Sequence, residues 1–170
     1  MSTFYQALAN IFGGLFSGMG LTILGAFIAV FLPGVGSARG VNMVARATAG
    51  LISEQPEKYG KSMLLQALPM TQGIYGLVVS FLILLFSGLL GGSPADMAAL
   101  PIETGVWYLF SALPIALGGY YSAIKQGEVA TAGVSVLAKR PEAVGKAVIS
   151  ASFVELYAIL ALLISVLLVL

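Results

Sequence analysis

The hexapeptide PEKYGK at residues 56–61 recurs as PEAVGK at residues 141–146, and this repeat decides the fold that the sequence predicts. Upstream, ATAGLISEQPE at 47–57 resembles ATAGVSVLAKRPE at 130–142, with a two-residue difference in length. Chance similarity of two loops is the alternative explanation. Because each copy follows one apolar stretch and precedes the next, duplication explains the pattern better. The sequence therefore predicts two helical hairpins in parallel orientation.

Four apolar stretches surround the repeats, at residues 11–36, 62–90, 106–124 and 147–170. Each is long enough to cross a hydrocarbon core of ~30 Å at ~1.5 Å per residue. Polar and apolar residues do not alternate in them, which favours helices over barrel strands. We therefore expect an all-α transmembrane protein of four helices. It forms a single membrane domain over residues 1–170, with one hairpin at about 1–90 and the other at about 104–170.

The composition also places the chain in a membrane, because 59% of its residues are hydrophobic, 9% are charged and the mean hydropathy is +1.00. A soluble domain carries about 25% charged residues. The chain has no cysteine and no histidine, which excludes disulfides, thiolate metal sites and a histidine base. The GKS at 60–62 lacks the earlier glycine of a phosphate-binding loop, since Gln55 stands there. Neither a nucleotide site nor a nucleic-acid partner is predicted.

The positive charges predict the orientation in the membrane. All eight basic residues flank the first and third links between the apolar stretches, at Arg39, Arg46, Lys58, Lys61, Lys125, Lys139, Arg140 and Lys146. Under the positive-inside rule both links are cytoplasmic, and both termini lie outside. The N-terminus has no basic region ahead of an apolar core, so we do not predict a cleaved signal peptide. We therefore expect a multi-pass integral membrane protein, located in a prokaryotic plasma membrane.

One acidic residue, Glu155, lies inside the fourth apolar stretch. A charge at that depth costs about 2.5–3.5 kcal/mol on insertion scales. The cost falls if the carboxylate binds a proton or a metal cation, or accepts hydrogen bonds. A protonated glutamic acid that only joins two helices is the plainer alternative. Ionisable residues within a membrane span are functional by default, which favours an ion-binding role.

The second apolar stretch offers oxygen-bearing partners on one helix face, because four residues follow the i, i+3, i+4, i+7 spacing: Leu68, Thr71, Gln72 and Tyr75. Pro69 removes a backbone N–H and can free carbonyls of the preceding turn. Gln126 lies at the cytoplasmic end of the third stretch. Together with Glu155 these groups can surround one hard cation. Periodicity alone leaves open that the polar side chains only join helices by hydrogen bonds.

Small residues concentrate in the first and third stretches, whereas the second and fourth are rich in Leu, Ile, Phe and Val. Small faces allow close approach of helices. Two interpretations remain open. Many copies of the first and third helices could line a narrow inner circle with the other helices outside, or the small faces could pack within one chain.

Five segments of the chain carry a resemblance to a known family: GSARG at 36–40, LPMTQGIYG at 68–76, QGEVATAG at 126–133, KRPE at 139–142 and VELYAIL at 154–160. They resemble the proteolipid rotor subunit of V-type and A/V-type ATPases, known as the c or K subunit. The resemblance covers essentially the whole chain, including its four spans and duplicated hairpins. It implies that copies of the chain form a homo-oligomeric rotor ring in the lipid membrane.

The resemblance also implies residue roles. Glu155 is the ion-carrying carboxylate, and the Na⁺ site is completed by Thr71, Gln72, Gln126 and the backbone carbonyl of Leu68. Tyr75 hydrogen-bonds the glutamate. Na⁺ is favoured over H⁺ as the transported ion, because a proton needs little beyond the carboxylate whereas Na⁺ needs several oxygen ligands. Met70 occupies the position of the first hairpin that corresponds to Glu155, which fits one carboxylate per four helices. No organic cofactor is implied.

The implied partners are a stator membrane subunit, whose arginine displaces the ion, and a central stalk subunit on the cytoplasmic side. Other, soluble subunits hydrolyse or synthesise ATP, so the chain has no catalytic site of its own. Two other classes remain: a small proton-coupled multidrug exporter with a lone membrane glutamate, and a structural four-span protein without a transport role. Exporters of that kind resemble the chain less, because their acid lies in the first span and they lack the duplicated hexapeptide.

Overall fold

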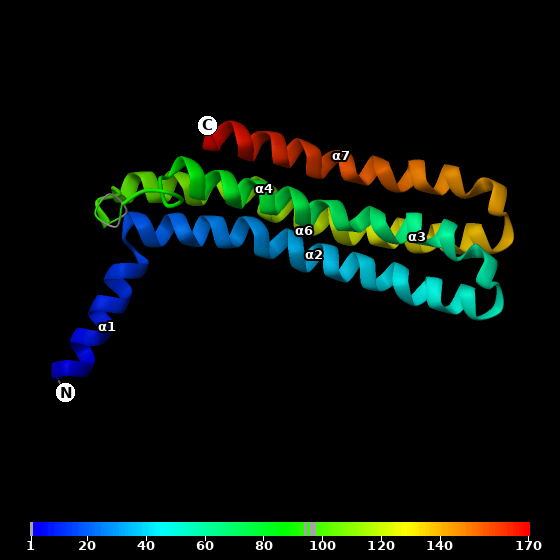
Figure 1. Cartoon of the computed structure of the whole chain (residues 1–170), viewed down its shortest axis with the longest axis horizontal. Helices are drawn as coiled ribbons and strands as arrows, with labels where there is room; N and C mark the ends of the chain where they lie inside the picture. Colours follow the sequence, from blue (N-terminus) through cyan, green and yellow to red (C-terminus); the bar gives the residue numbers. More distant parts are fainter. Residues whose placement is uncertain (1, 94, 96–97) are drawn as a thin grey trace.

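The computed structural model describes residues 2–93, 95 and 98–170, and the regular structure of these residues is helical. Long helical rods lie side by side in one bundle, as Figure 1 shows. The first and third rods are α2 (Gly18–Glu54) and α6 (Ile102–Lys139), and the fourth is α7 (Val144–Val169). The bundle confirms the predicted all-helical fold class.

The second rod is built from three short elements that follow one another without a loop. These are α3 (Tyr59–Ala67), the 3₁₀ helix η2 (Leu68–Met70) and α4 (Thr71–Phe86). After α4 the chain turns at Gly88 and Gly91, whose φ angles of 76° and 89° suit glycine. The second apolar stretch therefore ends as a helix at Phe86, four residues before the expected boundary.

The two turns at the opposite end of the bundle are equivalent, as expected from the repeated hexapeptide. Gln55 and Arg140 leave the helical region with φ/ψ of −136°/70° and −142°/80°, because each precedes a proline. The prolines then open the short 3₁₀ helices η1 (Pro56–Lys58) and η3 (Pro141–Ala143). The two hairpins thus share one turn geometry, which supports the duplication.

The sequence predicts polar links between the first and second apolar stretches, at 40–61, and between the third and fourth, at 125–146. Both predictions are wrong in extent, because α2 and α6 continue as helices to Glu54 and Lys139. At ~1.5 Å per residue the 37 residues of α2 span about 55 Å, well beyond a hydrocarbon core of ~30 Å. Buried apolar side chains hold these extensions together, in a cluster of Val44, Leu51, Leu65, Ala130, Val134, Leu137 and Ala151. Interhelical packing thus replaces the expected loops.

The first apolar stretch is also divided. The helix α1 (Ser2–Leu15) ends before the bundle and projects away from it (Figure 1). Ser17 starts α2: its side chain accepts a hydrogen bond from the Gly20 N–H at 3.1 Å, a helix N-cap. Its hydroxyl also donates to the Gly14 carbonyl at 2.6 Å. The bundle therefore begins at Gly18 rather than at the expected residue 11.

Small residues bring α2 and α6 together within one chain. A Cβ atom added at Gly36 would lie 2.6 Å from the Tyr120 carbonyl oxygen, and one added at Gly127 would lie 2.5 Å from the Gly40 Cα. Both contacts are with backbone, which cannot move aside. The small-residue faces predicted from sequence therefore pack against each other within one chain, which was one of the two interpretations left open. The inner circle of many copies stays a prediction.

By length and composition, three helical segments of the described residues can cross a membrane: Gly18–Glu54, Pro56–Phe86 and Pro141–Val169. The 38-residue α6 is long enough but is not among them. Glycines and aromatic residues with polar groups lower its mean hydropathy. The fourth membrane span therefore stays a prediction.

The packing of α2 on α6 predicts opposite effects for two glycine substitutions in α2. Gly36→Ala forces a methyl group into the Tyr120 backbone and should destabilise the protein by about 1–3 kcal/mol, as overpacking does. Gly50→Ala meets nothing within 4 Å and should be neutral or stabilise the helix by up to about 1 kcal/mol. Thermal unfolding in detergent, followed by circular dichroism, measures both. Equal melting temperatures would contradict the close approach.

Candidate ion-binding site

The carboxyl group of Glu155 lies on α7 and is partly buried against the other hairpin. The hydroxyl of Tyr75, on α4, donates a hydrogen bond to Glu155 Oε1 at 2.6 Å. This short contact joins residues 80 positions apart in sequence. The fourth helix is thus tied to the second by the one acidic side chain within the apolar part of α7.

Two glutamines continue the network into the interior of the bundle. Gln126 Nε2, on α6, donates to Glu155 Oε2 at 3.4 Å, and Gln72 Nε2, on α4, donates to Gln126 Oε1 at 2.6 Å. Both glutamine side chains are fully buried, with an exposed fraction of 0%. Burying an amide group is costly unless the group is hydrogen-bonded, and both glutamines meet this condition. A connected polar cluster therefore links α4, α6 and α7.

The turn at Leu68 supplies further oxygen atoms. Pro69 lacks a backbone N–H, and the chain forms the 3₁₀ helix η2 there, so the Thr71 N–H bonds to the Leu68 carbonyl. The expected break in the α-helical ladder at this proline is confirmed. Thr71 Oγ1 lies 3.2 Å from the Leu68 carbonyl oxygen and 3.4 Å from Gln72 Oε1.

This arrangement gathers three oxygen atoms from one helical turn. The Leu68 carbonyl oxygen already accepts the Thr71 N–H, and the Thr71 hydroxyl has one further hydrogen, which can serve this carbonyl oxygen or Gln72 Oε1. Each of the three oxygens therefore keeps a lone pair that a cation can use. Oxygen-rich spots of this kind suit hard cations, which take carbonyl, hydroxyl and carboxylate ligands.

The charge of Glu155 has no basic partner in the part of the chain that the structure describes. The basic residue nearest to Gln126 in sequence, Lys125, pairs instead with Glu128 at 3.0 Å on the exposed side of α6. A carboxylate that faces lipid must be neutralised, because the bare charge is costly there. Since no basic side chain among the described residues pairs with Glu155, a bound proton or cation can supply that neutrality.

All six residues expected from sequence thus lie in one connected cluster: Leu68, Thr71, Gln72, Tyr75, Gln126 and Glu155. The direct contact between Gln72 and Gln126 was not predicted, because 54 positions separate them and no spacing rule relates two different helices. Among the described residues no group of three His, Cys, Asp or Glu side chains forms a metal site. Neutral oxygens around one carboxylate are the ligands available.

Comparison with known proteins finds matches over most of the chain. The family model for the ATP synthase C subunit matches residues 24–83 and again 109–168. The chain is 46% identical over 153 residues to the V-type sodium ATPase subunit K of Enterococcus hirae, covering 90% of this chain and 92% of that protein. It is 38% identical over 149 residues to the A-type ATP synthase subunit K of Methanocaldococcus jannaschii, covering 87% of this chain and 61% of that protein.

The hydrogen bond from Tyr75 predicts a change in the reactivity of Glu155. In Tyr75→Phe the Oε1 atom loses its donor, and hydrogen bonds to charged groups contribute about 1.5–3 kcal/mol. We expect carbodiimide labelling of Glu155, followed by mass spectrometry, to become about tenfold faster, the effect of ~1.4 kcal/mol. Tyr59→Phe, on the exposed side of α3, is the control and should label like the unmodified chain. An unchanged rate in Tyr75→Phe would contradict the contact.

Proposed function

The chain belongs to the family of the ATP synthase C subunit, and from this premise we propose that Glu155 carries Na⁺ across the membrane as the rotor ring turns. The protein is an ion-carrying, non-catalytic membrane component of a rotary ATPase. The observation that supports the proposal most directly is the polar cluster around Glu155, which ties one carboxylate to neutral oxygen donors in an apolar bundle. Neither relative supports the multidrug-exporter alternative.

The proposed Na⁺ ligands are the carboxylate of Glu155, the side-chain oxygens of Thr71, Gln72 and Gln126, and the carbonyl of Leu68. The close spacing of the Leu68, Thr71 and Gln72 oxygens supports this set, as does the sodium specificity in the name of the Enterococcus relative. Gln126 now donates its NH₂ group to Glu155 Oε2. Ion binding requires its oxygen instead, so rotation of this amide is part of the proposed binding step. Tyr75 holds the carboxylate in place.

The ion neutralises Glu155 while rotation of the ring keeps this residue facing lipid, where a bare carboxylate is costly. We propose that a stator arginine displaces the ion, which leaves through one half-channel while another ion enters from a second. The absence of a basic partner for Glu155 among the described residues supports an external one. Each elementary charge that crosses exchanges about 2.3 kcal/mol per 100 mV with the membrane potential.

The proposed assembly is a homo-oligomeric ring in a prokaryotic plasma membrane, attached to a central stalk on the cytoplasmic side. Each chain contributes a single membrane domain, with α6 as its fourth span. The turns at η1 and η3 lie together at one end of the bundle, and the last turn of α4 and the first turn of α6 lie at the other (Figure 1). Because basic residues flank the two turns, the positive-inside rule places that end in the cytoplasm and both termini outside.

The proposal predicts that Na⁺ protects Glu155 from carbodiimide. A bound cation occupies the carboxylate and excludes the protonated form with which the reagent reacts. We expect labelling of the detergent-extracted protein to slow as Na⁺ is added and to be unaffected by K⁺ at the same ionic strength. Mass spectrometry of the labelled chain measures the rate. If Na⁺ gives no protection at any pH, the sodium part of the proposal is wrong and a proton is the cargo.

The neutral ligands can be tested in the same assay. Gln72→Leu removes one oxygen ligand and the hydrogen bond to Gln126, so the Na⁺ concentration for half-protection should rise at least tenfold. Ser80→Ala, which also removes a buried polar group from α4 but lies two turns away, is the matched control and should leave it unchanged. Equal half-protection in the two variants would remove Gln72 from the proposed ligand set.

The variant Glu155→Gln distinguishes an ion-carrying rotor subunit from a structural membrane protein without a transport role. The amide has nearly the same shape but no charge, so the ring should assemble while ATP-driven ion uptake into membrane vesicles by the whole complex falls to background. Glu128→Gln, which removes an exposed carboxylate on α6, should leave uptake unchanged. Full transport by Glu155→Gln complexes would mean that this carboxylate does not carry the ion.

A further inference from the structure

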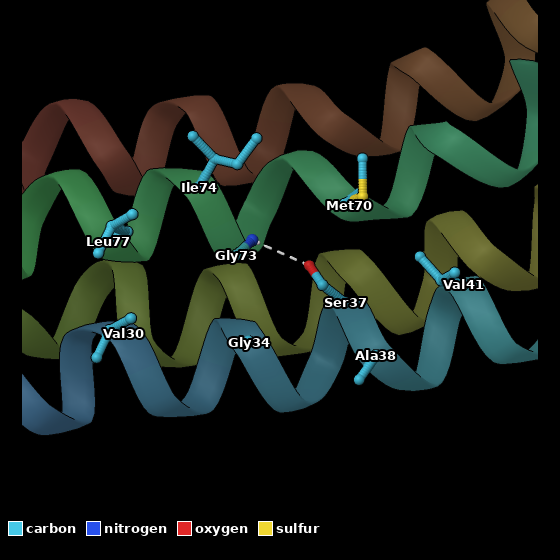
Figure 2. Close-up of a pocket in the computed structure, with 9 residues that line it drawn as sticks. All are labelled: Val30, Gly34, Ser37, Ala38, Val41, Met70, Gly73, Ile74 and Leu77. Carbon is cyan, nitrogen blue, oxygen red and sulfur yellow. Dashed lines mark hydrogen bonds between the residues drawn. The ribbon is translucent and has the colours of Figure 1, made fainter.

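The first turn of α4 carries two of the proposed ion ligands, Thr71 and Gln72, and is capped from another helix. Met70, which occupies the N-cap position, makes no side-chain hydrogen bond to the helix. Instead the Gly73 N–H donates to Ser37 Oγ of α2 at 2.9 Å, as Figure 2 shows. An N-cap serine accepts from the second or third N–H of its own helix, and Gly73 is the third residue of α4. Ser37 thus caps α4 from the neighbouring rod.

The capped turn follows an irregular stretch of backbone, so local hydrogen bonds hold it less firmly than the middle of a helix. Pro69 has no N–H, and the 3₁₀ turn η2 around it has poorer hydrogen-bond geometry than an α-helix. The Leu68 carbonyl, another proposed ligand, lies in this stretch. A bond to a second helix therefore adds a fixed point where the ligand-bearing turn needs one.

Close packing brings α2 to this turn. A Cβ atom added at Gly40 would lie 2.7 Å from the Pro69 side chain, and one added at Gly76 would lie 2.3 Å from the Ala29 carbonyl oxygen. Ser37 lies between these two contacts along α2 and is only 6% exposed. A buried hydroxyl is costly unless it is hydrogen-bonded. Its bond to α4 therefore fixes how one rod lies on the other at the level of the ligands.

The second hairpin carries the equivalent serine but uses it differently. The two matched segments begin at residues 24 and 109, so a shift of 85 residues carries Ser37 to Ser122. Ser122 is also 6% exposed, yet its hydroxyl donates to the Gly119 carbonyl of its own helix at 3.3 Å. The outer helix there, α7, continues through Glu155 without a 3₁₀ turn. The serine thus bonds across helices in the hairpin whose outer rod is broken at the ligands.

We propose that Ser37 is a positioning residue of the ion site. Its hydroxyl holds the peptide unit that joins Gln72 to Gly73, and this unit directs the Gln72 side chain toward Gln126. The same turn places Thr71 Oγ1 at 3.4 Å from Gln72 Oε1. Ligands that are ordered before the ion arrives lose less free energy on binding. Ser37 therefore raises the affinity for Na⁺ without touching the ion. This inference rests on the proposed function and adds a residue outside its ligand set.

Substitutions at position 37 test this role in the carbodiimide assay. Ser37→Ala removes the acceptor and should raise the Na⁺ concentration for half-protection of Glu155 about fivefold, the effect of ~1 kcal/mol, as one hydrogen bond contributes. Ser37→Thr keeps the hydroxyl, and Ser37→Val has nearly the same shape without it. We expect Ser37→Thr to behave like the unmodified chain and Ser37→Val like Ser37→Ala. Both β-branched variants enlarge the side chain equally, so their comparison isolates the hydroxyl.

Two controls separate positioning from a general loosening of the bundle. Ser122→Ala removes the equivalent, equally buried serine of the second hairpin and should leave half-protection unchanged. The labelling rate without Na⁺, measured at several pH values, should be the same in all variants, because the bonds from Tyr75 and Gln126 to Glu155 stay intact. A loosened bundle would change this rate together with the half-protection.

The unmodified chain separates failure of this inference from failure of the proposed function. If Na⁺ does not protect the unmodified chain, the sodium part of the proposed function is wrong and so is the positioning role. If Na⁺ protects it, three results overturn the positioning role alone and leave the ligand set standing. These are equal half-protection in Ser37→Thr and Ser37→Val, an equal loss in Ser122→Ala and Ser37→Ala, or a changed labelling rate of Ser37→Ala without Na⁺.

Discussion

A carboxyl group surrounded by hydrocarbon must be neutral or accept hydrogen bonds, and the arrangement of this bundle follows from that constraint. Glu155 receives one hydrogen bond from Tyr75 on the second rod and one from Gln126 on the third. Neither donor carries a charge that would hold the carboxylate permanently. In the proposed function the site binds its ion reversibly, because the ion, and no basic side chain of the described residues, neutralises the carboxylate. Reversible loading is what a rotor subunit requires.

The close approach of α2 and α6 makes the site possible. Backbone contacts at Gly36 and Gly127 leave no room for side chains between these helices. The two other rods then lie near enough to each other for Tyr75 to reach Glu155 at 2.6 Å. Pro69 adds a local effect, since the 3₁₀ turn that it causes directs the Leu68 carbonyl toward Thr71. Packing and a backbone irregularity together place the oxygens.

The duplicated hairpins are alike in backbone and different in chemistry. Both turn at a residue before proline, and the two turns have nearly the same φ and ψ. Glu155 lies in the second hairpin, and Met70 occupies the corresponding position in the first. Repetition of the backbone thus repeats the turn geometry, whereas the change of side chains limits the membrane carboxylate to one hairpin.

Much of this molecule could be predicted from the sequence, because the relevant signals are local. The repeated hexapeptide predicted the paired hairpins, and the helical period predicted that Leu68, Thr71, Gln72 and Tyr75 share a face. The position of Glu155 inside an apolar stretch predicted a carboxylate with an ion-binding role. Such signals depend on neighbours within one helix or on composition, and a sequence displays both directly. Gln126 was predicted as a further oxygen ligand from its place at the end of the third stretch, and the resemblance to rotor subunits implied the same role.

Other features were decided only by the tertiary structure. Residues 40–54 and 125–139 form helices rather than links because their apolar side chains bury one another across the bundle. The 2.6 Å contact between Gln72 and Gln126 depends on how two helices 54 positions apart approach each other. The open groove beside Met70, with a volume of about 490 Å³, is formed where the η2–α4 segment packs on α2. Helical periodicity describes one helix at a time, whereas the distance and rotation between helices arise from packing.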